Sequence, residues 1–401
     1  MRSDIETRLL NHLTHLCVEI GPRPSGSEEN QAAADYIQCA FRAAGLDVEE
    51  QRWACPDWQY GETHLAMNGT RLEAVANAFS PPCDVVASAV AVSTVAELEA
   101  ADLAGHIGIL YGDLTKAPLA CKSWFLASEQ DLHTIRLLEE KAPAALITIQ
   151  PKPGSLERII EDWEFCIPSA TVGAEEGLAL LREEELKVHL RIESERSPGW
   201  SCNVVGRKGD AGQPKIVLCA HYDTKFDTPG ATDNGGGAAV LLTLAQLLGQ
   251  REHTLGLEWI AFSGHEYLPL GDDEYLGRYE DSFPRIVAAI NFDCVGNILG
   301  ASSIASFVTS HPFQNHLVEL TRDYPGVVWV DPWPQSNHST FAWRNVPSLA
   351  LSSVGGGNIT HQRIDTIERV SPAKLVEVVS LIGDIVASLQ DKSPAWSRPA
   401  E

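Results

Sequence analysis

The hydrophobic and polar positions divide the chain into a helical entry, a stretch of short strands and a long region in which strands and helices alternate. Apolar residues recur at helical spacing over Asp4–Val18 and Glu28–Ala44, so we predict two amphipathic helices on either side of the turn Gly21–Ser27. The alternating region ends with a predicted helix over Pro372–Gln390, whose apolar residues fall on one face. This pattern predicts an α/β fold in which helices sandwich a mixed central sheet.

Apolar runs mark the strands of the α/β region. They are Lys215–Cys219, Leu255–Phe262, Arg285–Phe292, Val327–Val330 and Pro347–Ser352. Runs this rich in β-branched and apolar residues are typical of strands buried on both faces of a sheet. The last residues, Ser393–Glu401, are predicted to form a disordered tail.

From about Tyr60 to Pro198 the pattern changes to short β runs with few helices. We predict strands at Leu72–Val75, Val85–Val92, Ile107–Leu110, Ala144–Ile149 and Val188–Ile192, and helices near Val95–Ala104 and Thr134–Glu140. Residues 1–59 and 198–401 are therefore expected to form one domain, and residues 60–197 a smaller inserted β-rich α+β domain. No cluster of metal-ligand residue types recurs in the insertion, so we expect a lid or a channel wall there.

Composition and charge restrict the partners. The chain has 401 residues, 44% of them hydrophobic, and a formal net charge of −24. Nucleic acids and anionic membranes select for Lys and Arg patches, so we expect neither as a partner. Charges interrupt the N-terminus and no apolar run reaches about 18 residues, so a cytoplasmic protein is predicted. The nine cysteines show no C-x-x-C pair, and the oligomeric state stays open.

Candidate chemistry begins at the end of the strand Lys215–Cys219, where His221 and Asp223 follow. Open α/β sheets bind ligands at the carboxyl ends of their strands. Asp233 then precedes a helix that opens on Gly235–Gly237, and glycines let the backbone approach something closely, for which a metal cluster is a candidate. A phosphate cradle fits badly, because carboxylates crowd the loop. Taken singly, a structural histidine or a helix N-cap explains each residue as well.

Further metal-ligand residue types follow other predicted strands. Glu266 comes after Leu255–Phe262, Asp293 after Arg285–Phe292, and His361 lies in a late loop. Together with His221 and Asp233, these imidazole and carboxylate groups suit two divalent metal ions, zinc first, with manganese or cobalt as alternatives. Two such ions can share a carboxylate and a water, whose pKa they lower toward 7.

The set of motifs resembles the co-catalytic zinc aminopeptidases of metallopeptidase clan MH, whose relatives include glutaminyl cyclases and transferrin-receptor-like proteins. The motifs are H-Y-D at His221, D-N-G-G-G-A at Asp233, the H-E pair at His265, N-F-D at Asn291 and H-x-x-x-D-T at His361. The resemblance covers nearly the whole chain and implies the zinc-peptidase, phosphorylase/hydrolase-like fold. The insertion resembles the protease-associated domain of several peptidase families. The implied activity is release of N-terminal residues from peptides, with a metal-bridging water as the nucleophile.

The resemblance also implies roles for single residues. One metal would be held by His221 and Asp293, and the other by Glu266 and His361, with Asp233 bridging and followed by a cis peptide bond. Asp223 would accept the second imidazole N–H of His221. Asp365 and Thr366 would brace the His361 loop. Asn337 and His338 lie where relatives carry an S-D-H-x-x-F substrate-side loop, and here Asn337 replaces the acid.

The chain departs from the family at His265. Relatives have two consecutive glutamates, the first of which is the general base, whereas this chain has His265 followed by Glu266. We hypothesise that His265 accepts the proton of the bridging water, because histidine is the commonest general base. Two alternatives stay open. His265 can be a metal ligand, which shifts Glu266 toward the base role, or it can mark a homologue that keeps its metals with weak or no peptidase activity.

The charge of the loops also indicates whether the site binds the amino end or the carboxyl end of a peptide. Acidic loops suit the α-ammonium group that an aminopeptidase must hold, whereas a carboxypeptidase needs an Arg or Lys for a carboxylate. Arg363 and Arg344 keep the carboxypeptidase alternative open. Tyr267 is a candidate donor to the oxyanion, with core packing as its alternative. Glutaminyl cyclase-like aminolysis and a non-catalytic metal-bearing scaffold are the remaining alternatives.

Overall fold

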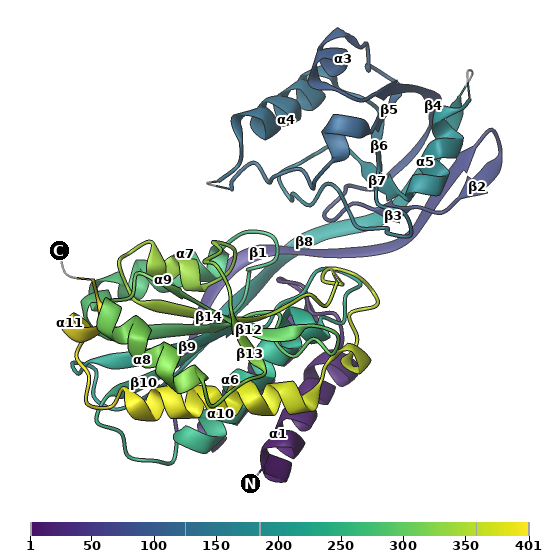
Figure 1. Ribbon diagram of the computed structural model, residues 1–401. Helices are drawn as coiled ribbons and strands as arrows, with labels where there is room; N and C mark the ends of the chain where they lie inside the picture. Colours follow the sequence, from purple (N-terminus) through teal and green to yellow (C-terminus); the bar gives the residue numbers. More distant parts are fainter. Residues whose placement is uncertain (1, 125, 184–185, 358, 400–401) are drawn as a thin grey trace. The chain divides into compact units, whose positions relative to one another are not determined.

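The computed structural model describes residues 2–124, 126–183, 186–357 and 359–399. It divides into two compact units, Met1–Cys55 with Trp200–Glu401, and Pro56–Gly199 (Figure 1). The chain crosses from one unit to the other within the long strands β1 (Asp47–Met67) and β8 (Lys187–Lys208).

The first unit contains a mixed sheet in the order β13-β12-β14-β11-β9-β10-β8. Its other strands are β9 (Lys215–His221), β10 (Gly256–Phe262), β11 (Ile286–Phe292), β12 (Ala301–Phe307), β13 (Val327–Trp329) and β14 (Ser348–Val354). The strand β9 pairs in parallel with both β10 and β11, and β11 pairs in parallel with β14. Strands β8 and β12 are antiparallel to their neighbours β10 and β14. The predicted mixed central sheet is confirmed.

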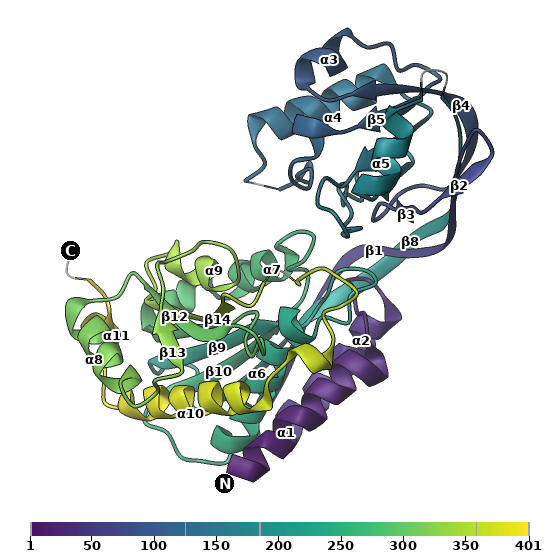
Figure 2. The ribbon, with the colours of Figure 1, turned by 45° about the vertical axis from the view of Figure 1, so that its right-hand side comes forward.

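Helices cover both faces of this sheet (Figures 1 and 2). The α-helices of the unit are α1 (Arg2–Thr14), α2 (Glu28–Ala43), α6 (Gly236–Leu248), α7 (Leu270–Tyr279), α8 (His311–Thr321), α9 (His338–Ala342), α10 (Pro372–Ser388) and α11 (Pro394–Ser397). A π-helical turn, His15–Ile20, extends α1, and 3₁₀ turns occupy Glu280–Arg285 and Ile367–Arg369.

The alternation of side chains along β9 shows how the two helical layers are held. Ile216 and Leu218 point into the core shared with α1, α2, α6 and α10. Val217 and Cys219 point into the opposite core, which contains Tyr275 of α7 and aromatic and aliphatic neighbours. Because β9 is apolar on both faces, it can only be a central strand between two covered faces.

The register of the parallel strands places their carboxyl ends at one level. His221 at the end of β9 pairs with Phe262 at the end of β10, and Cys219 pairs with Asn291 of β11. Residues that directly follow β9, β10 and β11 therefore emerge at the same edge of the sheet, where open α/β sheets bind ligands.

The second unit has its own small sheet. Its strands, in addition to parts of β1 and β8, are β2 (Thr70–Leu72), β3 (Val75–Ala76), β4 (Cys83–Val92), β5 (Ile107–Leu110), β6 (Ala145–Ile149) and β7 (Ser169–Val172). Its helices are α3 (Val95–Ala100), the 3₁₀ turn Gly112–Thr115, α4 (Glu129–Lys141) and α5 (Ala174–Leu181). Strands β4 to β7 are parallel, and Leu98 and Leu138 pack into a separate core beside them. Its assignment to the protease-associated domains stays a prediction.

Two expectations about elements differ from the structure. The strand β12 was not predicted, because its sequence ASSIASF has serines where a buried strand usually has aliphatic residues. The disordered tail was wrong for its described part, up to Pro399, because α11 packs there with Ser397 buried and Trp396 against Phe313. Among the residues that the structure describes, no helix is both long enough and apolar enough to cross a membrane.

Candidate metal centre

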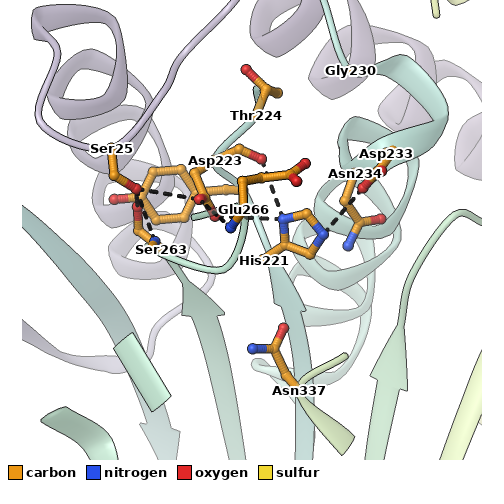
Figure 3. A network of polar contacts seen from close by, with 12 residues as sticks. Ser25, His221, Asp223, Thr224, Gly230, Asp233, Asn234, Ser263, Glu266 and Asn337 are labelled. Carbon is orange, nitrogen blue, oxygen red and sulfur yellow. Dashed lines mark hydrogen bonds and ion pairs between the residues drawn. The ribbon is translucent and has the colours of Figure 1, made fainter. Parts of the chain in front are cut away.

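His221 occupies the centre of the site. It is the last residue of β9 and is fully buried. Its Nδ1 lies 3.2 Å from the main-chain oxygen of Asp223 and 3.5 Å from Oδ1 of that residue. A proton on Nδ1 satisfies the contact with the main-chain oxygen, so Nε2 is left facing Asp233 Oδ1 at 3.3 Å (Figure 3). Asp293 Oδ1 lies 3.7 Å from the same nitrogen. Asp223 thus contacts the second ring nitrogen chiefly through its main-chain carbonyl, a contact that fixes the orientation of the ring.

Asp233 lies between two imidazoles. It belongs to the π-helical turn Ala231–Gly235 before α6, and the expected cis peptide bond joins it to Asn234. Its Oδ1 faces His221, whereas its Oδ2 lies 3.2 Å from Nε2 of His361. This is the arrangement that a bridging carboxylate needs.

The glycines that open α6 contact protein backbone. A Cβ on Gly237 would lie 2.5 Å from the carbonyl oxygen of Phe292, and one on Gly236 would lie 2.8 Å from that of Val295. Asn234 closes the same junction by donating from Nδ2 to Phe292 O at 2.8 Å. The expectation that these glycines make room for a metal cluster is therefore corrected, because they make room for the loop after β11.

Glu266 and His361 form the other half of the site. Oε2 of Glu266 lies 3.2 Å from Nε2 of His361. The main-chain N–H of Glu266 donates to Oδ2 of Asp223 at 3.1 Å, which connects this half to the loop after β9. Glu266 is buried, whereas 44% of the His361 side chain is exposed. All five predicted ligands thus converge at the carboxyl edge of the sheet.

The electrostatics of the cluster suit a cation. Four buried polar atoms have no hydrogen-bond partner in the described part of the chain: His221 Nε2, Asp223 Oδ1, Glu266 Oε1 and Asp293 Oδ1. Burial lowers the pKa of His221, but Asp223, Asp233 and Asp293 outweigh it and raise that pKa well above the usual value. Buried carboxylates with free oxygens are costly unless a positive charge compensates them. Imidazole and carboxylate donors in this number fit zinc or another divalent transition metal.

His265 lies against His221. The two ring centroids are 4.2 Å apart with an interplanar angle of 31°. Ligand atoms of His265, His221 and Asp293 all lie within 4.8 Å of one another. Burial and the neighbouring His221 lower the pKa of His265, so its ring is held neutral. Cys294, which sequence reasoning did not single out, joins Asp233 and Asp293 in a similar group.

A cavity of about 440 Å³ opens onto the cluster. Its polar floor contains Asp233, His265, Glu266, Asp293, Cys294 and His361. Apolar walls come from Val330, Trp333 and Val354, and Asp331 lies beside them. Among the described lining residues there is no Lys or Arg. A ligand in this cavity would therefore meet negative charge at one end and apolar surface at the other.

The loop residues Asn337 and His338 lie behind this lining. Asn337 donates from Nδ2 to Asp272 at 2.9 and 3.1 Å. His338 has an Nε2 contact of 2.7 Å with the carbonyl oxygen of Trp333, and burial lowers its pKa to about 4, so that neutral Nε2–H donates. Both residues hold the loop that carries Trp333, and direct contact with a substrate stays a prediction.

The other two predicted substrate residues also lie outside the cavity lining. The hydroxyl of Tyr267 accepts a hydrogen bond from the main-chain N–H of Phe226 at 2.9 Å. Arg363 has a 71% exposed side chain that pairs with Asp227 at 3.2 Å. Arg344 likewise pairs with Glu280. Their roles toward a substrate remain predictions.

Three further residues support the site, and sequence reasoning missed two of them. Asp365 was predicted to brace the His361 loop, and its carboxylate connects that loop to the Asp233 turn by accepting hydrogen bonds from Thr232 and from the main-chain N–H of Asp233 at 3.0 Å. Ser25 donates to Asp223 at 3.2 Å and accepts from Gly264 N at 3.0 Å. Arg23 donates to the main-chain oxygen of Gly230 at 3.2 Å. The position of Ser25 and Arg23 in the turn GPRPSGS gave no signal of these long-range contacts.

Comparison with known proteins places the site in context. The model of peptidase family M28 matches residues 203–386. Aminopeptidase YwaD of Bacillus subtilis strain 168 is 26% identical over 407 aligned positions, which cover 95% of this chain and 85% of that protein.

Solved structures share the fold over nearly the whole chain. A zinc aminopeptidase from Bacillus subtilis superposes with a TM-score of 0.79 at 21% identity, covering 99% of this chain and 98% of the other. An aminopeptidase from Aneurinibacillus sp. strain AM-1 gives a TM-score of 0.75 at 23% identity, with 99% and 95% covered.

Proposed function

Because residues 203–386 match the model of peptidase family M28, we propose that the protein is a zinc-dependent aminopeptidase that hydrolyses the N-terminal bond of peptides. The observation that carries this proposal is the clustering of His221, Asp233, Glu266, Asp293 and His361, of which all but the buried His221 line one cavity. The similarity to Aminopeptidase YwaD over most of both chains supports the same activity.

We assign two divalent ions to the site. His221 and Asp293 would hold one, Glu266 and His361 the other, and Asp233 would reach both, since its two oxygens face different imidazoles. When bound, such ions polarise the scissile carbonyl group and lower the pKa of a water molecule toward 7. The chain's own part is to fix the donors: β9, β10 and β11 place His221, Glu266 and Asp293 at one sheet edge, and the turn before α6 supplies Asp233.

The charge of the cavity favours the amino end of a peptide. Asp331 supplies a carboxylate that is not among the proposed metal ligands, and the described lining contains no Lys or Arg. An α-ammonium group is attracted to such a site, whereas a terminal carboxylate is repelled. Arg363 and Arg344, the candidates for a carboxypeptidase, are occupied by ion pairs with Asp227 and Glu280. The apolar walls would receive the side chain of the first substrate residue.

Hydrolysis also needs a group that takes a proton from the attacking water. His265 and Glu266 both line the cavity, and Oε1 of Glu266 is buried without a hydrogen-bond partner among the described residues. A general base of this kind contributes roughly 10²–10⁴ in rate. The cytoplasmic location and the absence of nucleic-acid and membrane partners stay predictions.

The proposal is tested by the hydrolysis of leucyl-p-nitroanilide. We expect turnover that a chelator abolishes and zinc restores, and no turnover of the N-acetylated substrate, because the acetyl group removes the α-ammonium charge. Asp233→Asn should lose about 10³-fold or more in kcat/KM, since it removes the bridging carboxylate. Asp227→Asn makes the same charge change in the same loop outside the cavity and should retain activity. Turnover that survives the chelator, or that prefers the acetylated substrate, contradicts the proposal.

A further inference from the structure

The main chain on both sides of His265 is fixed by hydrogen bonds. Gly264 has a positive φ of 73° and donates from its N–H to Ser25 at 3.0 Å. Glu266 donates from its N–H to Asp223 at 3.1 Å. The direction in which His265 leaves the sheet is therefore set by the same serine and aspartate that orient the ligand loop after β9.

The side chain of His265 is directed at the first half of the metal centre. The centroid of its ring lies 4.2 Å from that of the His221 ring. One of its ring nitrogens and the donor atoms of His221 and Asp293 all lie within 4.8 Å of one another. Two imidazoles on one tetrahedral zinc, with Zn–N distances of about 2.0–2.1 Å, hold their nitrogens about 3.3 Å apart. The observed spacing is compatible with a shared ion.

Two donor atoms beside this ring have no partner. In the described part of the chain, His221 Nε2 and Asp293 Oδ1 are buried without hydrogen-bond partners, and a nitrogen of the half-buried His265 lies within 4.8 Å of ligand atoms of both residues. These groups together form a site for one ion, because the two buried atoms would otherwise be left desolvated and unpaired.

We propose that His265 is a ligand of the ion held by His221 and Asp293, an inference that rests on the proposed function. With Asp233, this ion has four protein donors, whereas the ion at Glu266 and His361 has three. Four-coordinate shells made of protein alone are typical of structural zinc, and three-donor shells leave a position open for chemistry. The set with four donors would then bind its ion more tightly, and the set with three donors would leave a coordination position open for the substrate.

This assignment leaves Glu266 as the proton acceptor. Its Oε2 faces His361, while its Oε1 is buried with no partner. Oε1 takes one proton from the attacking water and returns it to the amine nitrogen when the C–N bond breaks, so the carboxylate is unchanged after each turnover. A histidine that is committed to an ion cannot perform this exchange.

X-ray absorption at the zinc edge tests the proposal on the unaltered protein. Loaded with one zinc per chain, the tight site should show two imidazole ligands per zinc. One imidazole per zinc would overturn the assignment of His265. A protein that binds no zinc would overturn the proposed function as well, so the two failures are distinguishable.

Zinc affinities of variants provide the second test, with a chromophoric chelator as competitor. His265→Ala should lower the affinity for the more tightly bound ion by about 100-fold or more, because mutation of residues that only orient a ligand already lowers metal affinity by about 10–100-fold. The affinity for the more weakly bound ion should change by less than about 3-fold. His265→Glu, which supplies a carboxylate donor, should recover most of the loss. His253→Ala, a histidine outside the cavity lining, is the control. Unchanged affinities in a folded His265→Ala protein would overturn the proposal.

Discussion

Asp365 ties two distant loops of the metal centre together. Its side chain is fully buried and accepts hydrogen bonds from the hydroxyl and main-chain N–H of Thr232 and from the main-chain N–H of Asp233. The bridging position of Asp233 is thus held from a residue four positions beyond His361. Groups that orient a metal ligand in this way contribute to metal affinity although they never contact the metal.

Asp365→Asn is expected to weaken zinc binding by about 10–100-fold. The amide has only one oxygen, so its NH₂ group would face the N–H of Asp233 or of Thr232, donor against donor. Competition with a chromophoric chelator measures the change. Asp323→Asn makes the same substitution on the exposed surface and should bind zinc like the unaltered protein. Equal affinity in both variants would contradict the bracing role of Asp365.

Arg23 is a second buried residue whose side-chain hydrogen bonds connect separate segments of the chain. Its guanidinium is completely buried and donates to main-chain oxygens of Leu16, Gly21, Tyr222, Pro229 and Gly230. It therefore connects the end of the first helical segment to the loop that leads to Asp233.

Arg23→Met is expected to lower the free energy of unfolding by about 3 kcal/mol or more, because it leaves buried carbonyl groups without donors. Urea unfolding followed by circular dichroism measures this loss. Arg322→Met, which removes an exposed side chain that pairs only with Glu319, should change stability by less than about 1 kcal/mol. A loss at Arg23 no larger than that at Arg322 would show that the buried hydrogen bonds contribute little.

At the level of elements, the junction of the Asp233 turn with α6 depends on small residues. Gly237→Ala would bring a Cβ to 2.3 Å from Asn234 Oδ1 and 2.5 Å from Phe292 O. We expect a loss of about 1–3 kcal/mol in stability from this overpacking, together with weaker zinc binding as Asn234 moves. Gly383→Ala lies within α10 with nothing inside 4 Å and should instead stabilise the protein by up to about 1 kcal/mol.

Thermal unfolding of the two glycine variants gives the comparison. Opposite signs of the change in melting temperature are the expected result. If the Gly237→Ala protein is as stable as the unaltered one, the loop after β11 can move to accommodate a Cβ. Close packing against that loop would then not explain the glycines at the start of α6.

Strand β10 carries a buried carboxylate that makes stability depend on pH. Burial alone would raise the pKa of Glu258, but Lys215 and Arg207 lower it below its ordinary value of 4.5. They lie 2.9 and 2.7 Å from its oxygens, and Tyr275 also donates to it. The stabilisation is fully present above pH 4.5 and is lost as the pH falls through the depressed pKa of the folded state.

Glu258→Gln is expected to cost about 3–5 kcal/mol at neutral pH, because it leaves Lys215 and Arg207 without their shared partner. The difference in unfolding free energy between the variant and the unaltered protein should shrink as the pH falls below 4.5. Chemical unfolding at a series of pH values measures it. A difference in unfolding free energy that stays constant below pH 4.5 would show that the pKa of Glu258 is the same in the folded and unfolded protein.

The elements were predicted from sequence where periodicity is strong. Strands β9, β10 and β11 are continuous apolar runs, and their ends carry the ligands, so both the strands and the site edge could be predicted. The strand β12 could not, because its alternating serines look polar until β13 and β14 pair with it. Supports such as Ser25 and Asp365 act across more than a hundred residues, and sequence spacing contains no information on such contacts.

At the scale of the whole molecule, a discontinuous catalytic unit is built from both ends of the chain. Helices α1 and α2 pack into the same core as α6 and α10, so the N-terminal segment completes the face of the sheet that the later helices cover. The unit Pro56–Gly199 has a core of its own. All described residues of the metal-centre cavity come from the catalytic unit alone, which agrees with the match of residues 203–386 to the peptidase family.

The central claim is that a metal-loaded site removes residues from the amino end of peptides. Mass spectrometry of an unblocked peptide, incubated with the zinc-loaded and the metal-free protein, tests it most directly. We expect a ladder of products shortened one residue at a time from the N-terminus, formed only by the zinc-loaded protein. Products shortened from the C-terminus, internal fragments, or a ladder of equal intensity without metal would contradict it.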